Sequence, residues 1–426
     1  MQLVAYGAQD IYLTGNPQIT FFKVVYRRHT NFAVESIEQT FNGQADFGKR
    51  VTATISRNGD LIQQMYLEVV LPVCTGTVIS STSNVWTYGV GNALVKQAEI
   101  EIGGQLIDRQ YGDWMNIWTE LTIPAGKRAG YDNMVGNNKP SNAVTQTGGL
   151  RITNINRLYV PLQFWFNRNP GLALPLIALQ YHEVKLNLEL RASGELINTD
   201  VGASPVIPAL GCKLYVDYVY LDTDERRRFA QVSHEYLIEQ VQFTGSESIP
   251  ALSGAKNVTL NFNHPVKELV WVHTTTAFAA SNATTGNRWF NYSGATASSV
   301  DSFTTALLQL NGHDRFSVRF ADYFRKVQNY EHHTRVPRVV GDLDGSGDNR
   351  QQYIYSYSFA LSPEEHQPSG TCNFSRIDNA VLQLGYGVDS GTGKAALALA
   401  MNLNIYAVNY NVLRIMSGMG GLAYSN

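Results

Sequence analysis

The sequence predicts an all-β protein built from two tandem antiparallel units, each a sandwich or a jelly roll. Three observations predict this class. The 426 residues exceed the roughly 250–300 at which a single hydrophobic core stops growing. Strand-favouring aromatic residues are plentiful, with 23 Tyr and 18 Phe. Blocks of sequence also recur about 200 residues apart, which indicates a duplicated fold. Helical patterns are scarce and short, the best being 111–121 and 224–230.

The duplication rests on five pairs of blocks that occur in the same order in both halves. Each pair is weak alone, but five in one order favour a duplicated domain over a solenoid, whose repeats span about 20–50 residues. The pairs are 37–43 with 238–245, 51–55 with 258–262, 99–105 with 307–313, 111–114 with 320–323, and 214–221 with 405–413. They predict an N-terminal arm at 1–19, a first unit at 20–222, a linker at 223–231 and a second unit at 232–426.

Alternation of polar and apolar residues marks individual strands. In 97–102 and 185–190 the apolar side chains fall on one face, which would point inward, and 381–384 repeats the pattern in the second unit. Short strands between Gly, Asn and Pro turns are typical of a sandwich or jelly roll, which closes two sheets over one core. The polar inserts 125–149 and 274–302 should lie at the surface as long loops.

Composition excludes several classes of function. Lys and Arg total 33 against 35 Asp and Glu, a net charge of −2, whereas a nucleic-acid binder usually carries a basic excess. We therefore expect no direct contact with nucleic acid. The three cysteines are far apart and form no CxxC pair, which favours a reducing compartment over a disulfide framework. No secretion signal and no apolar run of about 20 residues is present, so we expect no membrane span.

Candidate catalytic motifs fail on their spacing. The pairs His182-Glu183 and His234-Glu235 begin like HExxH, but neither has the second histidine that zinc requires. The segment 391–394 resembles part of a phosphate loop without its preceding glycine or its hydroxyl residue. His332 and His333 are adjacent and are expected at the surface. We expect no catalytic, cofactor-binding or metal site, and no enzymatic activity.

Two polar features leave a bound calcium ion and a glycan to be considered. The loop Asp342–Asp348 has three carboxylates and two glycines that could wrap a calcium ion, but the bidentate Glu of an EF-hand is missing. An exposed, solvated loop is therefore the preferred interpretation. Sequons occur at Asn257, Asn282, Asn291 and Asn373, and those at 282 and 291 lie in a polar insert where a glycan would be tolerated.

Five long segments resemble the major capsid proteins of chlorella viruses (phycodnaviruses) and their relatives among the nucleocytoplasmic large DNA viruses. The resemblance spans essentially the whole chain and is specific. The segments are 6–23 (YGAQDIYLTGNPQITFFK), 55–61 (ISRNGDL), 170–185 (PGLALPLIALQYHEVK), 367–379 (QPSGTCNFSRIDN) and 410–424 (YNVLRIMSGMGGLAY).

The resemblance implies a double jelly roll of two eight-stranded units and a homotrimeric, pseudo-hexagonal capsomer in an icosahedral outer capsid. It implies assembly in the host cytoplasm, a shell outside an internal viral membrane, and minor capsid proteins as partners at the capsomer base. Some relatives carry glycans on loops of the second unit. The segment 387–400 contains no asparagine, so the candidates here are Asn282, Asn287 and Asn291.

Two other classes of function remain as alternatives. An all-β enzyme, such as a glycoside hydrolase or a cupin-type oxygenase, would need paired carboxylates in a cleft or a histidine-rich metal face, and the sequence shows neither. An adhesive or carbohydrate-binding jelly roll would expose aromatic platforms and usually carry a secretion signal. A structural capsid subunit is the function that the sequence favours.

Overall fold

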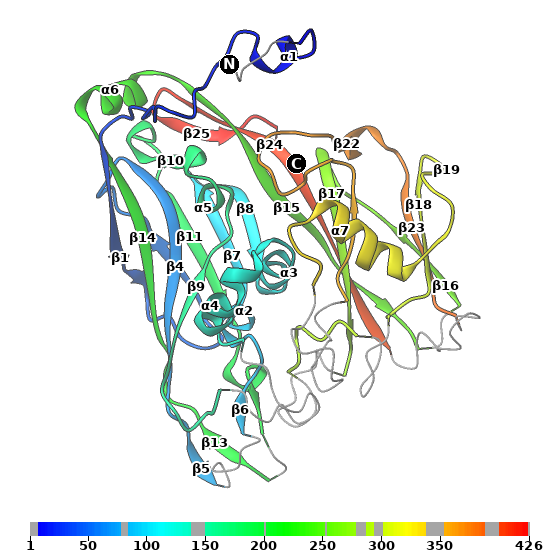
Figure 1. Cartoon of the computed structure of the whole chain (residues 1–426). Helices are drawn as coiled ribbons and strands as arrows, with labels where there is room; N and C mark the ends of the chain where they lie inside the picture. The colour runs from blue at the N-terminus through cyan, green and yellow to red at the C-terminus, as the bar shows by residue number, and fades with distance from the viewer. Residues whose placement is uncertain are drawn as a thin grey trace.

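Two β units lie side by side in the computed structural model of the chain (Figure 1). The structure describes residues 7–77, 84–137, 150–199, 202–251, 254–277, 287–293, 301–337, 353–387 and 400–424. The chain runs through the first unit, crosses by helix α6 (Thr223–Gln231) and completes the second. Both units are antiparallel throughout their described strand pairs.

The first unit is a sandwich of two five-stranded sheets. One sheet has the order β1-β14-β4-β10, with β9 also paired to β4, and the other has the order β2-β3-β11-β7-β8. The strands are β1 (Phe32–Gln39), β2 (Phe41–Asn42), β3 (Arg50–Thr54), β4 (Leu61–Leu71), β7 (Val95–Ile102), β8 (Gln105–Tyr111), β9 (Asn156–Pro161), β10 (Leu174–Pro175), β11 (Val184–Leu190) and β14 (Gly211–Leu221).

The second unit repeats this arrangement. One sheet has the order β15-β24-β17-β21, with β22 on β17 and β25 on β24, and the other has the order β16-β23-β18-β19, with β20 on β18. The strands are β15 (His234–Ile249), β16 (Ala255–Thr259), β17 (Pro265–Thr275), β18 (Thr305–Leu310), β19 (His313–Asp314), β20 (Arg319–Phe320), β21 (Tyr355–Ser358), β22 (Cys372–Asn373), β23 (Ala380–Gly385), β24 (Met401–Met416) and β25 (Met419–Leu422).

Equivalent strands carry the sequence blocks that predicted the duplication. The repeated blocks fall on β1 and β15, on β3 and β16, on β7 and β18, and on β14 and β24. These strands occupy the same positions in the two strand orders, β1-β14-β4 with β15-β24-β17 and β3-β11-β7 with β16-β23-β18. The predicted double jelly roll is therefore confirmed, and the two units are called the first and second jelly rolls below.

Local sequence explains why the strands form where they do. In β11 every second side chain is buried, and β7 ends in the tight β7–β8 hairpin. Gly103 and Gly104 adopt φ of 59° and 85° there, which only glycine does without steric cost. The inward side chains form one continuous core whose fully buried members include Trp86, Trp114 and Trp271. The apolar faces predicted for 97–102 and 185–190 therefore point into the core, as the alternation indicated.

Short helices and small sheets fill the connections. Both predicted helices form, as α3 (Gly112–Thr122) and α6. The remaining elements are α1 (Ile11–Thr14), α2 (Val90–Leu94), α4 (Ala125–Val135), α5 (Trp165–Arg168), α7 (Gln328–His332), the 3₁₀ turns η1 (Pro170–Leu172), η2 (Leu176–Ala178), η3 (Ser193–Glu195) and η6 (Phe374–Arg376), the π-helix η4 (Tyr323–Val327), and the pairs β5 (Thr75–Thr77) with β13 (Ser204–Val206) and β6 (Val85–Trp86) with β12 (Ile197–Asn198).

One expectation about the inserts is wrong in part. The segment 125–149 was expected to be a surface loop, but its first half forms α4, whose Tyr131 and Val135 are buried. A tyrosine and a valine four residues apart lie on one helix face, so they can pack against the body while the polar face stays wet. Among the described residues, no helix is both long and apolar enough to cross a membrane.

Candidate functional site: the junction of the two jelly rolls

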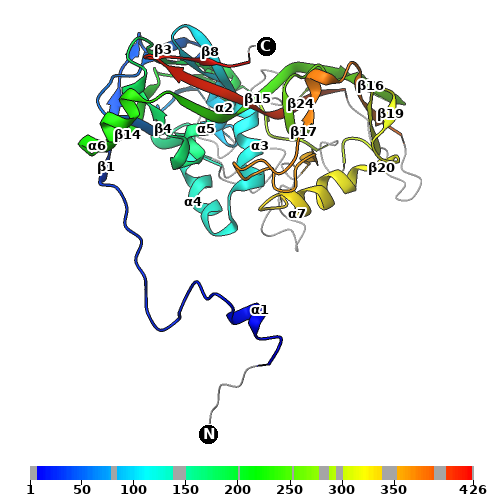
Figure 2. The ribbon, with the colours of Figure 1, turned by 90° about the horizontal axis from the view of Figure 1, so that it is seen from above.

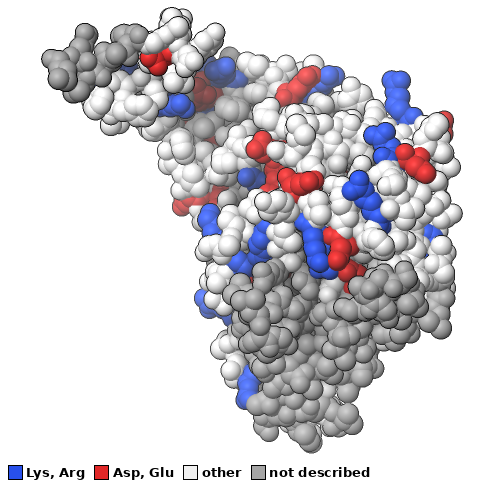
Figure 3. Space-filling model, turned by 45° about the vertical axis from the view of Figure 1, so that its right-hand side comes forward, with Lys and Arg blue, Asp and Glu red and all other residues white. Residues whose placement is uncertain are grey.

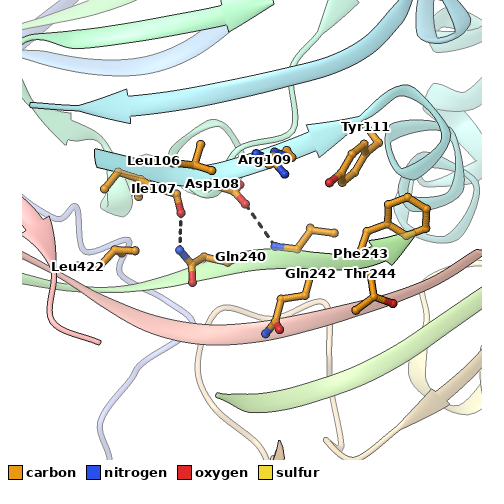
Figure 4. A pocket seen from close by; sticks show the side chains of 11 residues that line it. Leu106, Ile107, Asp108, Arg109, Tyr111, Gln240, Gln242, Phe243, Thr244 and Leu422 are labelled. Carbon is orange, nitrogen blue, oxygen red and sulfur yellow. Dashed lines mark hydrogen bonds between the residues drawn. The ribbon is translucent and has the colours of Figure 1, made fainter. Parts of the chain in front are cut away.

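The contact between the two jelly rolls, called the junction here, contains several buried polar groups. Strand β8 of the first jelly roll lies along β15 of the second (Figure 4). The Gln240 side chain donates to the Ile107 carbonyl, and the Val241 amide donates to Asp108 Oδ1 at 3.3 Å. A pocket of about 230 Å³ opens beside these contacts. Burial raises the pKa of Asp108 to about 7, because water is withheld from its carboxylate.

A buried charge cluster joins two strands and one helix across the junction. Glu239 of β15 accepts from Arg168 Nη1 at 2.9 Å and pairs with Lys267 Nζ of β17 at 2.7 Å. The Lys267 side chain is 0% exposed, and burial lowers its pKa while Glu239 opposes that shift. An unpaired ammonium at this depth would be very costly, so Glu239, together with the nearby Glu268, allows Lys267 to stay charged there.

Asp113 forms a second polar centre at the junction. It lies in the first turn of α3, in the first jelly roll, and accepts hydrogen bonds from Tyr292 Oη at 2.5 Å, Tyr406 Oη at 2.8 Å and Asn404 Nδ2 at 3.2 Å. All three donors belong to the second jelly roll. Burial raises the pKa of Asp113, although these three hydrogen bonds favour the carboxylate and oppose that rise.

A segment of the second jelly roll, residues 287–293, lies across the first. Asn287 Nδ2 donates to the carbonyls of Gly194 and Ile197, both at 2.8 Å, and Trp289 Nε1 donates to the Glu195 carbonyl at 2.9 Å. The Arg191 guanidinium stacks over the Trp289 ring at 3.9 Å. These contacts add to those between β8 and β15 in fastening the two jelly rolls together.

This segment contains two of the residues considered for glycosylation, and both are buried. Asn287 is 0% exposed and Asn291 is 6% exposed. A glycan on Asn287 Nδ2 would replace a hydrogen that this buried nitrogen uses to hold Gly194 or Ile197. Asn287 is therefore a junction residue in the folded chain, and Asn291 is buried in the same segment. Asn282 lies outside the described residues.

The histidine predictions have mixed outcomes. His182 Nδ1 lies 3.0 Å from the Gly420 carbonyl, and His234 Nε2 lies 2.8 Å from the Phe229 carbonyl, so each is engaged by backbone. The expectation of a surface position is wrong for His333, whose side chain is buried between Glu268 at 3.1 Å and Glu364 at 3.0 Å. The turn after α7 folds it onto β17, which adjacency in sequence could not reveal.

Metal-binding and basic surfaces were the other features to locate. In the described ranges, no group of three or more His, Cys, Asp or Glu side chains is placed to hold a metal ion. The loop Asp342–Asp348 lies outside those ranges. On the face shown in Figure 3, basic and acidic side chains stand beside one another without a large patch of one sign. That face lacks the basic field that a nucleic-acid surface would need.

A second candidate surface is the N-terminal arm. From residue 7 to the start of β1 the chain leaves the body as an extended segment, seen clearly from above in Figure 2. Its apolar side chains are open to solvent, with Phe22 100% and Tyr12 91% exposed. Ordinary surfaces rarely expose so many large apolar residues together, and such a patch marks an interaction site.

Comparison with known proteins agrees with this architecture. Residues 20–222 match the family described as "Major capsid protein N-terminus", and residues 225–421 match "Large eukaryotic DNA virus major capsid protein". The chain is 53% identical over 437 residues to the major capsid protein of Pyramimonas orientalis virus, covering 100% of this chain and 99% of that one. It is 45% identical over 465 residues to the major capsid protein of Paramecium bursaria Chlorella virus 1, with the same coverage.

A solved structure extends the likeness to the fold. The crystal structure of PBCV-1 VP54, fitted into a reconstruction of the virophage Sputnik, matches with a TM-score of 0.77 and 41% identity, covering 96% of this chain and 100% of that one. Fold and junction together define a double-jelly-roll viral capsid protein. The chain belongs to the family of major capsid proteins of large eukaryotic DNA viruses. The resemblance found in the sequence is thus confirmed.

Sequence reasoning missed the residues that make the junction. Asp113 and Glu239 both lie within the repeated blocks, so the duplication had singled out their positions without assigning them a role. Their equivalents in the other jelly roll, Asp322 and Glu38, have the same chemistry but are exposed. The members of each pair differ in exposure because one jelly roll packs on the other. No signal in the neighbouring sequence indicates which member will be covered.

Proposed function

We propose that three copies of this chain form a pseudo-hexagonal capsomer that tiles the icosahedral shell of a large double-stranded DNA virus. The supporting observation is that two jelly rolls with one strand order are fastened to each other by buried polar contacts. Three chains with two similar jelly rolls each present six similar walls. A trimer can therefore fill a lattice site that has six neighbours, and a head-to-tail contact closes when three rotations complete a circle.

The stability of such a capsomer sets a requirement on its interface. An obligate interface buries on the order of 2,000 Å² or more and is rich in apolar and aromatic residues. The junction inside one chain already has this character, with the rings of Tyr111 and Trp114 both in contact with the ring of Tyr406. The proposal needs a comparable surface between chains.

Mass and shape test the proposal directly. Multi-angle light scattering on the purified full chain should give about three times the chain mass of 47.3 kDa. Negative-stain electron microscopy of the same sample should show particles with a six-sided outline. A stable single chain at concentrations well above micromolar, with no larger species, would contradict the trimer.

The proposed domain division places its boundary in α6, with a first domain at 20–222, a linker at 223–231 and a second domain at 232–426. Support comes from the strand pairing, because each described strand pairs within its own half. α6 has exposed charged residues, and Asp222, just before its first residue, caps the helix by accepting a hydrogen bond from the Thr223 amide. The extended arm continues past residue 19 until β1 begins at Phe32.

We further propose that the arm lies at the capsomer base and binds minor capsid proteins there, beside the inner viral membrane, after assembly in the host cytoplasm. Its exposed apolar side chains support a partner of this kind. Deleting residues 2–15 should lower particle yield while leaving thermal unfolding of the chain unchanged, because the arm contributes little to the core. Normal particle yield from the deleted chain would contradict this role.

The remaining proposals concern modification and activity. Glycosylation stays a proposal for Asn282, which intact-protein mass spectrometry of virion material can test with Asn282→Gln as the control. The chain is proposed to act structurally and without catalysis. Its family relatives are capsid proteins, which supports this assignment.

A further inference from the structure

Asp108, on β8, is a buried carboxylate of the junction that has no ion-pair partner. It is 3% exposed, and none of the described lysines, arginines and histidines forms an ion pair with it. Its carboxylate accepts hydrogen bonds from neutral groups, including Gln110 Nε2 at 2.8 Å and the Val241 amide at 3.3 Å. A carboxylate that is buried without a cation is costly, so it must either hold a proton or gain a positive charge from outside the chain.

The arginines near Asp108 are engaged by other carboxylates. Arg109 pairs with Glu99 at 2.7 Å, and Arg168 pairs with Glu239 at 2.9 Å. Arg168 therefore acts on Asp108 only as a longer-range attraction. Glu239 is buried to a similar extent, at 5% exposed, but has two cations in contact. The fold thus supplies Glu239 with positive charge and leaves Asp108 without it.

Asp108 lines a pocket between two edge strands (Figure 4). β8 and β15 each stand at an end of their sheet's strand order, and no described backbone pair joins them. Side chains bridge the two strands instead, as Gln240 does when it donates to the Ile107 carbonyl. Edge strands leave backbone N–H and C=O groups unpaired, so the gap between them is polar. Its volume of about 230 Å³ is below the roughly 300–1,000 Å³ of pockets for drug-sized ligands, so an occupant must be small.

The pocket combines this carboxylate with apolar walls. Leu106, Phe243 and Leu422 line it beside Asp108, and Thr244 adds a hydroxyl at an exposed position. A cationic head on a short hydrocarbon chain matches this combination, because the head pairs with the carboxylate while the chain covers the apolar side chains. A metal ion matches it poorly, since hard cations take several oxygen ligands and Asp108 is the only carboxylate among the described residues that line the pocket.

We propose that this pocket binds a small aliphatic amine, whose ammonium group takes Asp108 as its counter-ion. The bound amine contacts both jelly rolls, since Asp108 belongs to the first and Phe243 and Thr244 belong to the second. It supplies the positive charge that the fold omits, and it strengthens the junction as a ligand of the folded chain alone does. The pocket lies within one chain, so it is present whatever number of copies associates.

Amine binding should strengthen as pH rises, because Asp108 must be ionised. Burial raises the pKa of Asp108 to about 7, although hydrogen bonds from Gln110 and Val241 and the charge of Arg168 oppose that rise. A primary ammonium keeps its proton up to about pH 10. From pH 6 to pH 8 the ionised fraction of Asp108 rises from about one-tenth to about nine-tenths, so the affinity should rise about tenfold. The charged or titratable side chains around Asp108 are Glu99 on β7, Arg109 and Tyr111 on β8, Arg168 on α5 and Glu239 on β15.

Isothermal titration calorimetry of the purified full chain tests the site. The diamine 1,4-diaminobutane should bind at pH 8, and it should bind about tenfold more weakly at pH 6. Butane-1,4-diol has a similar length without the charge and should give no binding. A parent chain that gives no heat with millimolar diamine at pH 8, and no rise in melting temperature, would overturn the proposal.

A matched pair of variants assigns the binding to Asp108. Asp108→Asn keeps the size of the side chain and an acceptor for the Val241 amide but removes the charge, so the diamine affinity at pH 8 should fall by at least about tenfold. Asp378→Asn makes the same change at an exposed residue that does not line the pocket, and it should leave the affinity unchanged. Circular dichroism and thermal melting check that both variants are folded.

Thr244→Trp tests the pocket without altering Asp108. Thr244 is exposed at the rim, so the chain tolerates a larger side chain there, and the indole ring fills the space that the amine would occupy. The diamine affinity should again fall by at least about tenfold, and this variant decides the question if Asp108→Asn does not fold. Parental affinity in a folded pocket variant, equal affinity for the diamine and the diol, or equal affinity at pH 6 and pH 8 would each overturn the amine site.

Discussion

The sheets β1-β14-β4 and β15-β24-β17 share one strand order but differ in their surroundings. Glu38 on the first is exposed and pairs with the exposed Lys213 at 2.9 Å, whereas Glu239 on the second is buried and holds Arg168 and Lys267. The difference shows that two duplicated residues can have the same chemistry and still contribute differently to stability, because different segments pack over them. The same carboxylate is a screened surface charge in one place and a structural necessity in the other.

Replacing these two glutamates should give the largest contrast. Glu239→Ala removes the carboxylate that is in direct contact with the buried Lys267 and Arg168, so we expect a loss of about 3–5 kcal/mol in the free energy of unfolding. Glu38→Ala removes an exposed pair and should cost less than about 1 kcal/mol. Urea unfolding followed by tryptophan fluorescence, at dilutions where light scattering finds single chains, measures both. Equal losses of unfolding free energy in the two variants would show that burial at the junction gives Glu239 no additional effect on stability.

The two equivalent aspartates give the next contrast. Asp113→Ala leaves the hydroxyls of Tyr292 and Tyr406 and the Asn404 amide without their acceptor, and we expect a loss of about 2–4 kcal/mol. Asp322→Ala removes an exposed carboxylate whose partner Arg325 keeps its ion pair with Asp301, so single-chain stability should change by less than about 1 kcal/mol. The same urea titration applies. A small effect at Asp113 would mean that water replaces the lost carboxylate.

The His333 cluster, which belongs to the second jelly roll alone, should make stability depend on pH. Burial by itself lowers the pKa of His333, but Glu268 and Glu364 outweigh it and raise the pKa from 6.5 to about 9. A pKa raised by folding stabilises the protein fully below pH 6.5, and that stabilisation is lost as pH rises through 9. We expect a loss of roughly 2–3 kcal/mol between pH 6 and pH 10.

A variant isolates this contribution from other alkaline effects. In His333→Gln the residue at 333 has no titrating ring, so the part of the pH dependence that His333 supplies should disappear, and the two curves of stability against pH should converge at high pH. Urea unfolding at intervals of one pH unit measures both chains. Parallel curves for the parent and the variant would assign the alkaline loss to another group.

Local sequence was sufficient for the elements and for the family. Period-two alternation in 97–102 and 185–190 predicted β7 and β11, and the glycine pair at 103–104 predicted the hairpin turn that follows β7. Both predictions succeeded because strand faces and turn dihedrals depend on nearby residues. The repeated blocks predicted the duplication for the same reason, since equivalent strands keep equivalent patterns. Segment resemblance supplied the family, which the comparisons confirmed.

Burial of polar residues could not be predicted in this way. His333 was expected at the surface and is buried, and Asn287 was considered for a glycan and is a junction residue. Part of the 125–149 insert is a packed helix. In each case the deciding contact comes from a segment distant in sequence, so no window around the residue contains the signal.

The sequence by itself determined that this chain is a double jelly roll of a viral capsid family, because alternation, turns and repeated blocks are written residue by residue. Only the tertiary structure decided which member of each duplicated pair became interior. Glu239 is buried and Asp113 is half-buried, while Asp322 and Glu38 are exposed, because one jelly roll packs on one face of the other and leaves the matching face open. Burial is a property of the assembled surface around a side chain, and the local pattern of polar and apolar residues carries no record of it.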